Sequence, residues 1–414
     1  MQKNIILIIT ACLTMCFSSC RKDIDKSSEQ PGSIKSIPEY GEPAEQMILG
    51  RKLQNAYSVT YMQAAYDTLC IKSRLNQLPY PINIGLQIRT THLYIRFLPQ
   101  NISEYDYLID QSGLELFAYP LDYEIVQPGL YYIDPSITPE EMTWLYTVIS
   151  VKDAGNITLP YEILDYCFIP DDPSSPGGTI EEETLILLEL EALRITGNIT
   201  EEEYNEGVGT RGGAKPQGYI RVRNNSPNNN VLEGVKKVKV RVHNIVKWDA
   251  AYTDEIGYYK MSKKYLTNVH YAVIYENATG FKVWGNFAFL APAHYDLGIN
   301  SKSGYSRNIE TNSDAWLWST VNNAAYIYRE KMCPNLNVTK PASNLRLWTV
   351  RMGGNWTGCA PMAHRFSLAS ATLANFLGVF SVTSKLFYIT SVMPDVFIIK
   401  KLYRYQRLLC HRFS

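Results

Sequence analysis

One stretch of this 414-residue chain alternates strictly between basic and apolar side chains, which restricts it to one kind of secondary structure. Residues 237–242 read Lys-Val-Lys-Val-Arg-Val. Because successive side chains of a strand point to opposite faces of a sheet, this period of two predicts a half-buried antiparallel strand. Residues 218–224 and 270–275 alternate in the same way. The centre of the chain is therefore predicted to be rich in β-structure.

The basic side of this strand comprises Lys237, Lys239, Arg241 and His243. A row of like charges on one side of an element is typical of a face in contact with water. We therefore expect a solvated sheet face here, with anion binding as the alternative.

A turn is predicted between the second and third of these alternating segments, in Thr253-Asp-Glu-Ile-Gly-Tyr-Tyr259. Gly257 lies where a tight hairpin needs a positive φ, and the Asp254 side chain can accept hydrogen bonds from the backbone of the turn. The two residues are predicted to be structural turn residues.

Together, Val238-Lys-Val240 and the Thr253–Tyr259 motif resemble the carboxypeptidase regulatory-like domain, a transthyretin-like β-sandwich. The resemblance covers about residues 216–276. It implies an antiparallel β-sandwich that serves as a spacer or packing module rather than as a catalyst.

The first twenty residues have the order of an export signal. A positively charged start precedes an apolar stretch from Ile5 to Cys16, and Ser18 and Ser19 precede Cys20. The apolar stretch is shorter than the about 20 residues that span a bilayer. Two small residues before a cysteine resemble the lipobox of bacterial lipoproteins, which implies that Cys20 is acylated. A plain secretory signal with a chance cysteine is the alternative.

The chain resembles Gram-negative surface lipoproteins, and the resemblance implies an exported protein held on the outer membrane at its cell-surface or periplasmic face. Residues 1–19 would be the signal peptide, and residues 20–42 the lipid anchor and a flexible tether. Its first partner would be the lipid bilayer, reached through acylated Cys20. A cell-surface protein or a glycan is the second kind of partner expected.

We expect an α+β multidomain fold. Residues 43–170 are predicted to be an α+β domain, with helical spacing in two pieces over 44–69, an N-cap at Ser58, and strands at 90–98, 114–119 and 161–169. Residues 171–215 are predicted to hold a helix from Ile180, a capping box at Thr200–Glu203 and a glycine-rich linker. Residues 277–399 are predicted to be an incomplete α/β region, with a helix over 309–328 capped near Ser313.

Composition and motifs exclude several functions. Lys plus Arg equals Asp plus Glu at 40 each, so no net positive field favours nucleic acid. The six histidines are scattered, and neither a zinc-ligand spacing nor a nucleophile motif is present. We therefore predict no catalytic residue, no metal ligand and no cofactor for the chain as given. An exported location permits a disulfide between Cys333 and Cys359.

The last residues change character. Residues 400–414 are basic and unpatterned, which indicates an out-of-frame tail. Codons for Gln406–Ser414, read one base later, can encode a segment ending in Phe-His-Glu, the beginning of an HExxH zinc motif. In this alternative, residues 277–399 resemble the upstream part of a zincin-type metallopeptidase, and zinc would bind only if the frame were restored.

Five tryptophans follow residue 280. A sugar-stacking platform on a surface glycan-binding protein is one interpretation of them, but their apolar periodicity favours burial in a core. They are Trp284, Trp316, Trp318, Trp348 and Trp356.

Overall fold

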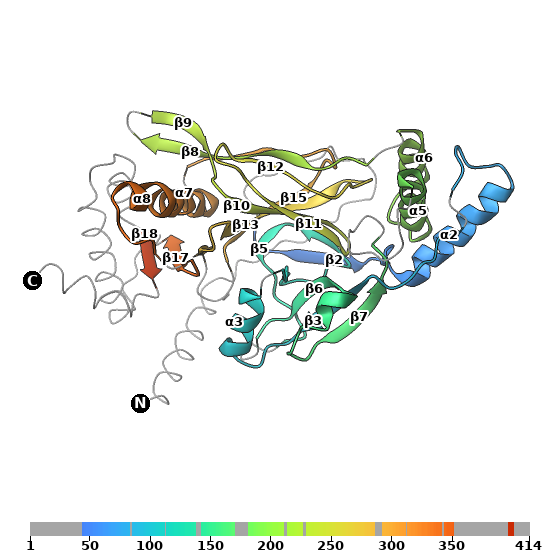
Figure 1. The fold of residues 1–414 in the computed structure, drawn as a ribbon, viewed down its shortest axis with the longest axis horizontal. Helices are drawn as coiled ribbons and strands as arrows, with labels where there is room; N and C mark the ends of the chain where they lie inside the picture. The colour runs from blue at the N-terminus through green and yellow to red at the C-terminus, as the bar shows by residue number, and fades with distance from the viewer. Residues whose placement is uncertain are drawn as a thin grey trace, which may run out of the picture. The chain divides into compact units, whose positions relative to one another are not determined.

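The computed structural model describes most of the chain after residue 43, and the protein has a mixed α and β fold with several antiparallel sheets (Figure 1). The described residues are 44–82, 85–111, 113–137, 142–169, 181–210, 213–226, 229–285, 292–311, 313–341, 343–351 and 396–400.

A three-stranded antiparallel sheet forms the centre of the region before residue 170. Its middle strand β3 (His92–Phe97) pairs with β6 (Leu145–Ser150) on one side and with β7 (Glu162–Cys167) on the other. The strands expected over 90–98 and 161–169 are thus confirmed. β3 is buried along most of its length because apolar clusters cover both of its faces. The helices α3 (Ile102–Asp110) and α4 (Val151–Ala154) accompany this sheet.

The prediction of a helix in the first part of residues 44–69 is wrong. Residues there form β1 (Ala44–Gln46), parallel to β5 (Gly129–Tyr131), and β2 (Ile48–Lys52), antiparallel to β4 (Tyr123–Gln127). A few spaced apolar residues fit either element, and pairing with distant strands decided the outcome.

The second piece is confirmed. Helix α2 (Val59–Arg74) begins after Ser58, whose hydroxyl accepts a hydrogen bond from the Tyr61 amide. The strand predicted over 114–119 is wrong, because that segment makes only a single bridge, between Phe117 and Tyr146.

Two helices follow, α5 (Glu182–Ile195) and α6 (Glu201–Thr210). The capping box before α6 is confirmed: the Thr200 hydroxyl accepts from the Glu203 amide, and the Glu203 carboxylate accepts from the Thr200 amide. Helix α5 packs against α2 and is buried on nearly all sides, so its Glu189 and Glu191 are buried as well as its leucines.

Two sheets make up the centre of the chain. The first holds β8 (Gln217–Ser226), β9 (Asn229–Gly234), β12 (Tyr258–Lys260) and β16 (Arg307–Ile309). The second holds β10 (Val238–Asn244), β11 (Lys247–Tyr252), β13 (Val269–Asn277), β15 (His294–Asn300), β14 (Lys282–Trp284), β17 (Arg346–Arg351) and β18 (Val396–Lys400). The alternating segments at 218–224, 237–242 and 270–275 are therefore strands, as predicted.

One apolar cluster joins the two sheets. Ile220 and Val222 from the first sheet belong to it, together with the valines of β10 and the inner residues of β13 and β15. The strands β15 and β16 follow residue 276 but are bonded to β13 and β8, so both sheets continue past the end predicted for this region.

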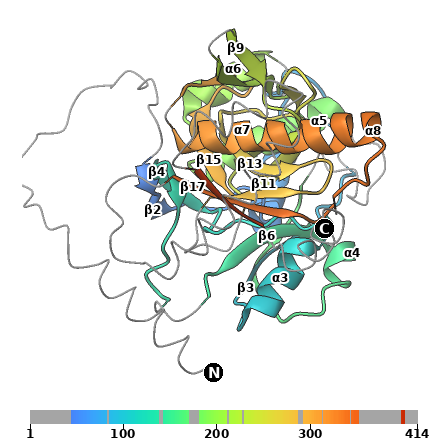
Figure 2. The same cartoon turned by 90° about the vertical axis from the view of Figure 1, so that its left-hand side faces the viewer.

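Helix α7 (Asp314–Ile327) covers part of the same cluster and crosses in front of the sheets in Figure 2. It begins after Ser313, whose hydroxyl accepts from the Trp316 amide, as expected for the predicted cap. A π-helical turn, η1 (Tyr328–Met332), and a short helix α8 (Cys333–Asn335) continue it.

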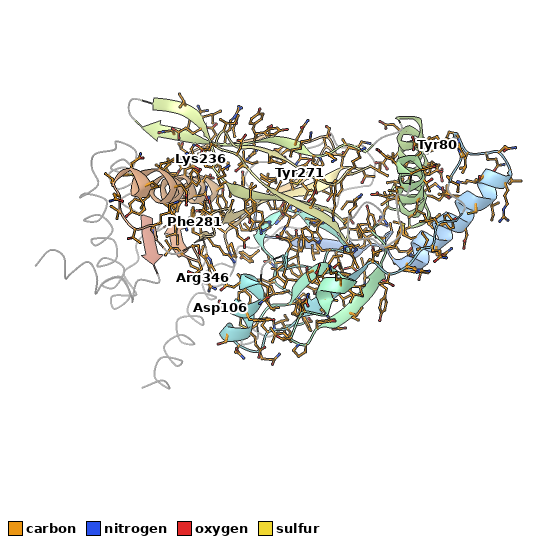
Figure 3. All side chains as sticks on the ribbon, in the orientation of Figure 1. Tyr80, Asp106, Lys236, Tyr271, Phe281 and Arg346 are labelled. Carbon is orange, nitrogen blue, oxygen red and sulfur yellow. The ribbon has the colours of Figure 1, made fainter. Side chains whose placement is uncertain are left out.

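The described residues belong to one compact unit, and the domain boundaries predicted within it stay predictions. One link across a boundary is visible in Figure 3, where Arg346 of β17 lies beside Asp106 of α3. Its Nη1 atom is 2.6 Å from Asp106 Oδ1. No helix among the described residues has both the length and the apolar character needed to cross a bilayer.

Candidate functional site

The basic side of β10 is not solvated, and this corrects the expectation for that strand. Arg241 and His243 are 4% and 5% exposed, and the Lys239 side chain is 14% exposed. Valines cover the opposite face of β10, so the sheet is buried on both sides. The residues that bury the basic side come from the region before residue 170, which sequence spacing could not reveal.

We call this group of side chains the polar layer. It consists of Glu115 and Tyr119 from the segment between α3 and β4, Lys239, Arg241 and His243 from β10, His270 and Glu276 from β13, and His294 and Asp296 from β15. The cross-strand register brings its members together, because Arg241 lies opposite Ala272, which in turn lies opposite Asp296.

Glu115 is the acceptor at one end of the layer. Its Oε1 atom is 3.0 Å from Arg241 Nη1, and its Oε2 atom is 3.0 Å from Lys239 Nζ. Lys239 also binds Glu276 of the neighbouring strand. Arg241 donates a second hydrogen bond to the Leu116 carbonyl, and its guanidinium lies 3.8 Å from the centre of the Phe117 ring. Two strands and one incoming segment are thus joined by charged hydrogen bonds.

Histidines occupy the other end of the layer. The His243 and His270 rings lie directly across from one another on β10 and β13, with centroids 4.9 Å apart. Tyr119 Oη is 3.1 Å from His243 Nε2. His270 Nε2 lies 2.7 Å from Asp296 Oδ1, and Asp296 also accepts from the backbone amides of Gly129 and Gly298. Asp296 therefore connects β15 to β5.

Neighbouring charges shift the pKa values of Glu115, Asp296 and Lys239 in the directions that favour ion pairs, against the effect of burial. Burial on its own would raise the pKa of Glu115, but the charges of Lys239 and Arg241 outweigh it and lower that pKa. Burial likewise opposes the lowered pKa of Asp296, which results from His270 and His294. The pKa of Lys239 is raised by Glu115 and Glu276 against the effect of burial.

The pKa values of two histidines are instead shifted in the direction that favours the neutral ring. Burial lowers the pKa of His243 well below its ordinary value, and His270 and Arg241 lower it further. Burial lowers the pKa of His294 to about 3, although Asp296 opposes the change. These two rings are therefore neutral at physiological pH, and protonating them would introduce charge beside Arg241.

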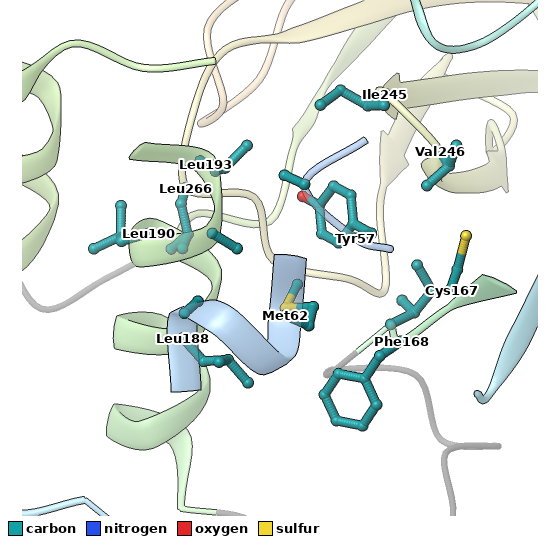
Figure 4. Packing of buried hydrophobic residues seen from close by; sticks show 14 of the residues in the cluster. Tyr57, Met62, Cys167, Phe168, Leu188, Leu190, Leu193, Ile245, Val246 and Leu266 are labelled. Carbon is teal, nitrogen blue, oxygen red and sulfur yellow. The ribbon is translucent and has the colours of Figure 1, made fainter. Parts of the chain in front are cut away.

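A second contact lies at the tip of the hairpin that joins β10 and β11. Ile245 and Val246 form its two-residue loop and belong to the apolar cluster that also contains Tyr57, Cys167 and the leucines of α5 (Figure 4). Ile245 has a φ of 50°, which is strained for a β-branched residue.

The next residue of this hairpin, Lys247, is 1% exposed and ends on a buried helix. Its Nζ atom is 2.9 Å from Glu189 Oε2 of α5, and Tyr57 Oη donates to Glu189 Oε1 over 2.6 Å. The hairpin is thus held by an apolar tip and a buried ion pair. Because these groups are buried by the chain itself, the arrangement holds two regions together rather than presenting an acid or base to a substrate.

The predicted turn residues lie together at the start of β12. Gly257 has a φ of 83°, and Asp254 Oδ1 accepts from the Ile256 and Tyr258 amides. A Cβ atom at Gly257 would lie 2.1 Å from the Ile220 carbonyl oxygen. This turn shapes the first sheet and does not contact the polar layer.

Other predicted site residues fall partly outside the described residues. Cys20 and Cys359 both lie outside, and so does the tail over 401–414. Cys333 is buried in α8, and no cysteine among the described residues is bridged to another, so the Cys333–Cys359 bridge stays a prediction. The described part of the chain contains no group of three or more metal-ligating side chains with suitable geometry.

Three of the five tryptophans are confirmed as core residues. Trp284, Trp316 and Trp318 are 1%, 8% and 4% exposed, so they offer no platform to a sugar. The Trp348 side chain and Trp356 are outside the described residues.

Sequence reasoning missed the acids of the polar layer and the Lys247–Glu189 pair. One signal was available for the first: Glu115 interrupts the apolar run 114–119, where a charge needs a buried partner. Glu189 gives the same signal within the apolar run 185–193, and Lys247 stands between Val246 and Trp248.

Comparisons with known proteins give little information. No protein-family model matches this sequence, and no curated protein matches it. Among solved structures, an (S)-allantoin synthase crystal structure is similar over 31% of this chain and 48% of its own, at 11% identity and a TM-score of 0.15. This chain thus spans about half the length of that protein, and a likeness of this degree carries no functional argument.

Proposed function

We propose that this chain is an exported lipoprotein in which a transthyretin-like β-sandwich acts as a rigid packing module. As given, it is proposed to have no catalytic role. The observation that carries the packing role is the polar layer: one face of the β10–β13–β15 sheet is occupied by the chain's own Glu115 and Tyr119.

Support for the sandwich comes from the two central sheets. Their inner residues belong to one apolar cluster, and the Asp254–Gly257 turn precedes β12 as the regulatory-like motif requires. The proposed sandwich includes β15 and β16 in addition to residues 216–276.

Support for a rigid module comes from its second face. A spacer that swings freely would keep its outer faces solvated, whereas this one buries Arg241 in an ion pair with Glu115 and Lys247 in an ion pair with Glu189 of α5. Breaking a buried pair by removing one partner typically costs about 3–5 kcal/mol, so such pairs resist relative motion of the two regions.

Limited proteolysis tests the packing role. Wild-type protein and a Glu115→Gln variant would be digested under native conditions, with Glu124→Gln as a control at an exposed acid. We expect faster cleavage between residues 111 and 143 in the Glu115 variant alone. Equal cleavage of all three proteins would contradict a packing role for the sandwich.

Export and anchoring rest on the N-terminal residues and need a separate test. Cells expressing the full chain would be labelled with a radioactive fatty acid, alongside Cys20→Ala and Cys16→Ala variants. We expect label and membrane fractionation in the wild type and the Cys16 variant, and neither in the Cys20 variant. Label that persists in the Cys20 variant would overturn the assignment.

A further inference from the structure

The outer side of the first central sheet carries a group of aromatic, cationic and amide side chains that the packing role does not use. Ile220, Val222, Tyr259 and Ile309 point inward from this sheet into the core. The residues between them point outward and are half-buried or exposed. We call them the tyrosine–arginine face: Gln217, Tyr219, Arg221, Tyr258, Lys260 and Asn308. In Figure 1, β8, β9 and β12 lie along the upper border of the ribbon, and α7 lies below β8.

The side chains of this face are held in fixed positions. Tyr219 and Tyr258 lie directly across from one another on β8 and β12, with ring centroids 5.3 Å apart. The Arg221 guanidinium lies 4.4 Å from the centre of the Tyr219 ring. Tyr258 Oη donates to Gln217 Oε1 over 2.8 Å. Stacking orients the guanidinium and leaves its N–H groups available to an acceptor.

The cations at the two ends of the face are not neutralised within the described chain. Neither Arg221 nor Lys260 forms an ion pair with a described carboxylate, whereas the next arginine on the same strand, Arg223, is bound by both oxygens of Glu310. The face therefore attracts negative charge.

The distance between the two cations favours a ligand that carries several charges over a single small ion. Lys260 lies opposite Gln217, four residues along β8 from Arg221. At a rise of roughly 3.4 Å per residue the two positions are about 14 Å apart along the strand, too far for one small anion to bridge. Tyrosine rings and the amides of Gln217 and Asn308 lie between or beside them, and these groups suit sugar rings and hydroxyls.

We propose that the tyrosine–arginine face binds an anionic polysaccharide, with sugar carboxylates on Arg221 and Lys260 and a ring against the tyrosine pair. A polysaccharide is favoured over nucleic acid because the amides of Gln217 and Asn308 suit sugar hydroxyls, and nucleic acid is kept as an outcome of the test. The site is separate from the polar layer, so it goes beyond the packing role and can fail independently of it.

Binding of the full-length protein to polygalacturonate, with dextran as the neutral polymer, tests the proposal. We expect binding to polygalacturonate alone, weakened by added salt. The combined Arg221→Gln and Lys260→Gln variant should bind about tenfold or more weakly, a loss of roughly 1.4 kcal/mol or more. Lys152→Gln, which removes an exposed cation of α4, should bind like the wild type. Tyr219→Phe should retain binding, and Tyr219→Ala should lose most of it.

Three results would overturn the proposal. The first is no measurable binding of polygalacturonate by wild-type protein that has a native circular dichroism spectrum. The second is equal binding by the Arg221 and Lys260 variant. The third is a single-stranded oligonucleotide of matched charge that binds as tightly as the polyuronate, which would assign the face to nucleic acid. Proteolysis of the Glu115 variant reports the packing role separately.

Discussion

Glu115 and Arg241 form a buried ion pair across 126 residues of sequence, with Oε1 and Nη1 3.0 Å apart. Each belongs to a different part of the chain, and neither has a local partner that would neutralise it. Removing Glu115 would leave Arg241 and Lys239 buried without their shared carboxylate.

We therefore expect Glu115→Gln to lower the free energy of unfolding by about 3–5 kcal/mol, measured by urea denaturation. The Glu124→Gln control removes an acid whose side chain is 52% exposed and 3.8 Å from Arg51 Nε, and should change stability by less than about 1 kcal/mol. Similar losses in both variants would show that the pair has no special role.

The neutral histidines predict a loss of stability in weak acid. The pKa of His243 and of His294 is lowered in the folded state, so the unfolded chain binds more protons below their ordinary value of 6.5. Stability is fully present above that pH and falls as the pH drops from 6.5 toward 3. At pH 5 His294, with its pKa of about 3, should account for about 2 kcal/mol of the loss, and His243 acts in the same direction.

The measurement is the slope of unfolding free energy against pH between 6 and 4. His294→Gln should reduce that slope by about one proton, or about 1.4 kcal/mol per pH unit. Glu115 and Asp296 add a separate loss at lower pH, since their lowered pKa values are reached only in stronger acid. An unchanged slope in the His294 variant would contradict the assignment of a neutral ring.

The positive φ of Ile245 predicts an unusual order of stability for two substitutions at this position. Both Ile245→Ala and Ile245→Gly remove buried apolar surface, at a cost of about 2–5 kcal/mol. Only glycine relieves the strain of a φ of 50°, which amounts to about 1–2 kcal/mol. The glycine variant should therefore be the more stable of the two in urea unfolding. A more stable alanine variant would show that the hairpin tip is unstrained.

Gly257 and Gly113 form a matched pair for the turn. Their φ angles are 83° and 85°, but an added Cβ would strike the Ile220 carbonyl only at Gly257 and would meet nothing within 4 Å at Gly113. We expect Gly113→Ala to destabilise by about 1 kcal/mol through strain alone. Gly257→Ala should cost more than about 2 kcal/mol because the turn must also move. Equal melting temperatures would contradict the close approach.

The sequence by itself determined the local features of this protein. The caps at Ser58, Thr200 and Ser313 and the turn at Asp254–Gly257 depend on residues within a few positions of each other, so pattern and hydrogen-bonding capacity were sufficient to predict them. The strands at 218–224, 237–242 and 270–275 were likewise visible as alternation.

Only the tertiary structure decided which faces are buried. The alternation in β10 separates its valines from Lys239 and Arg241, but it does not say whether water or protein lies beyond the charged side. Here the partner is Glu115, 124 residues from Lys239, and the same kind of distant contact turned residues 48–52 into a strand beside β4. Burial depends on which surfaces meet in space, and the spacing of residues along one segment does not identify the segment that packs against it.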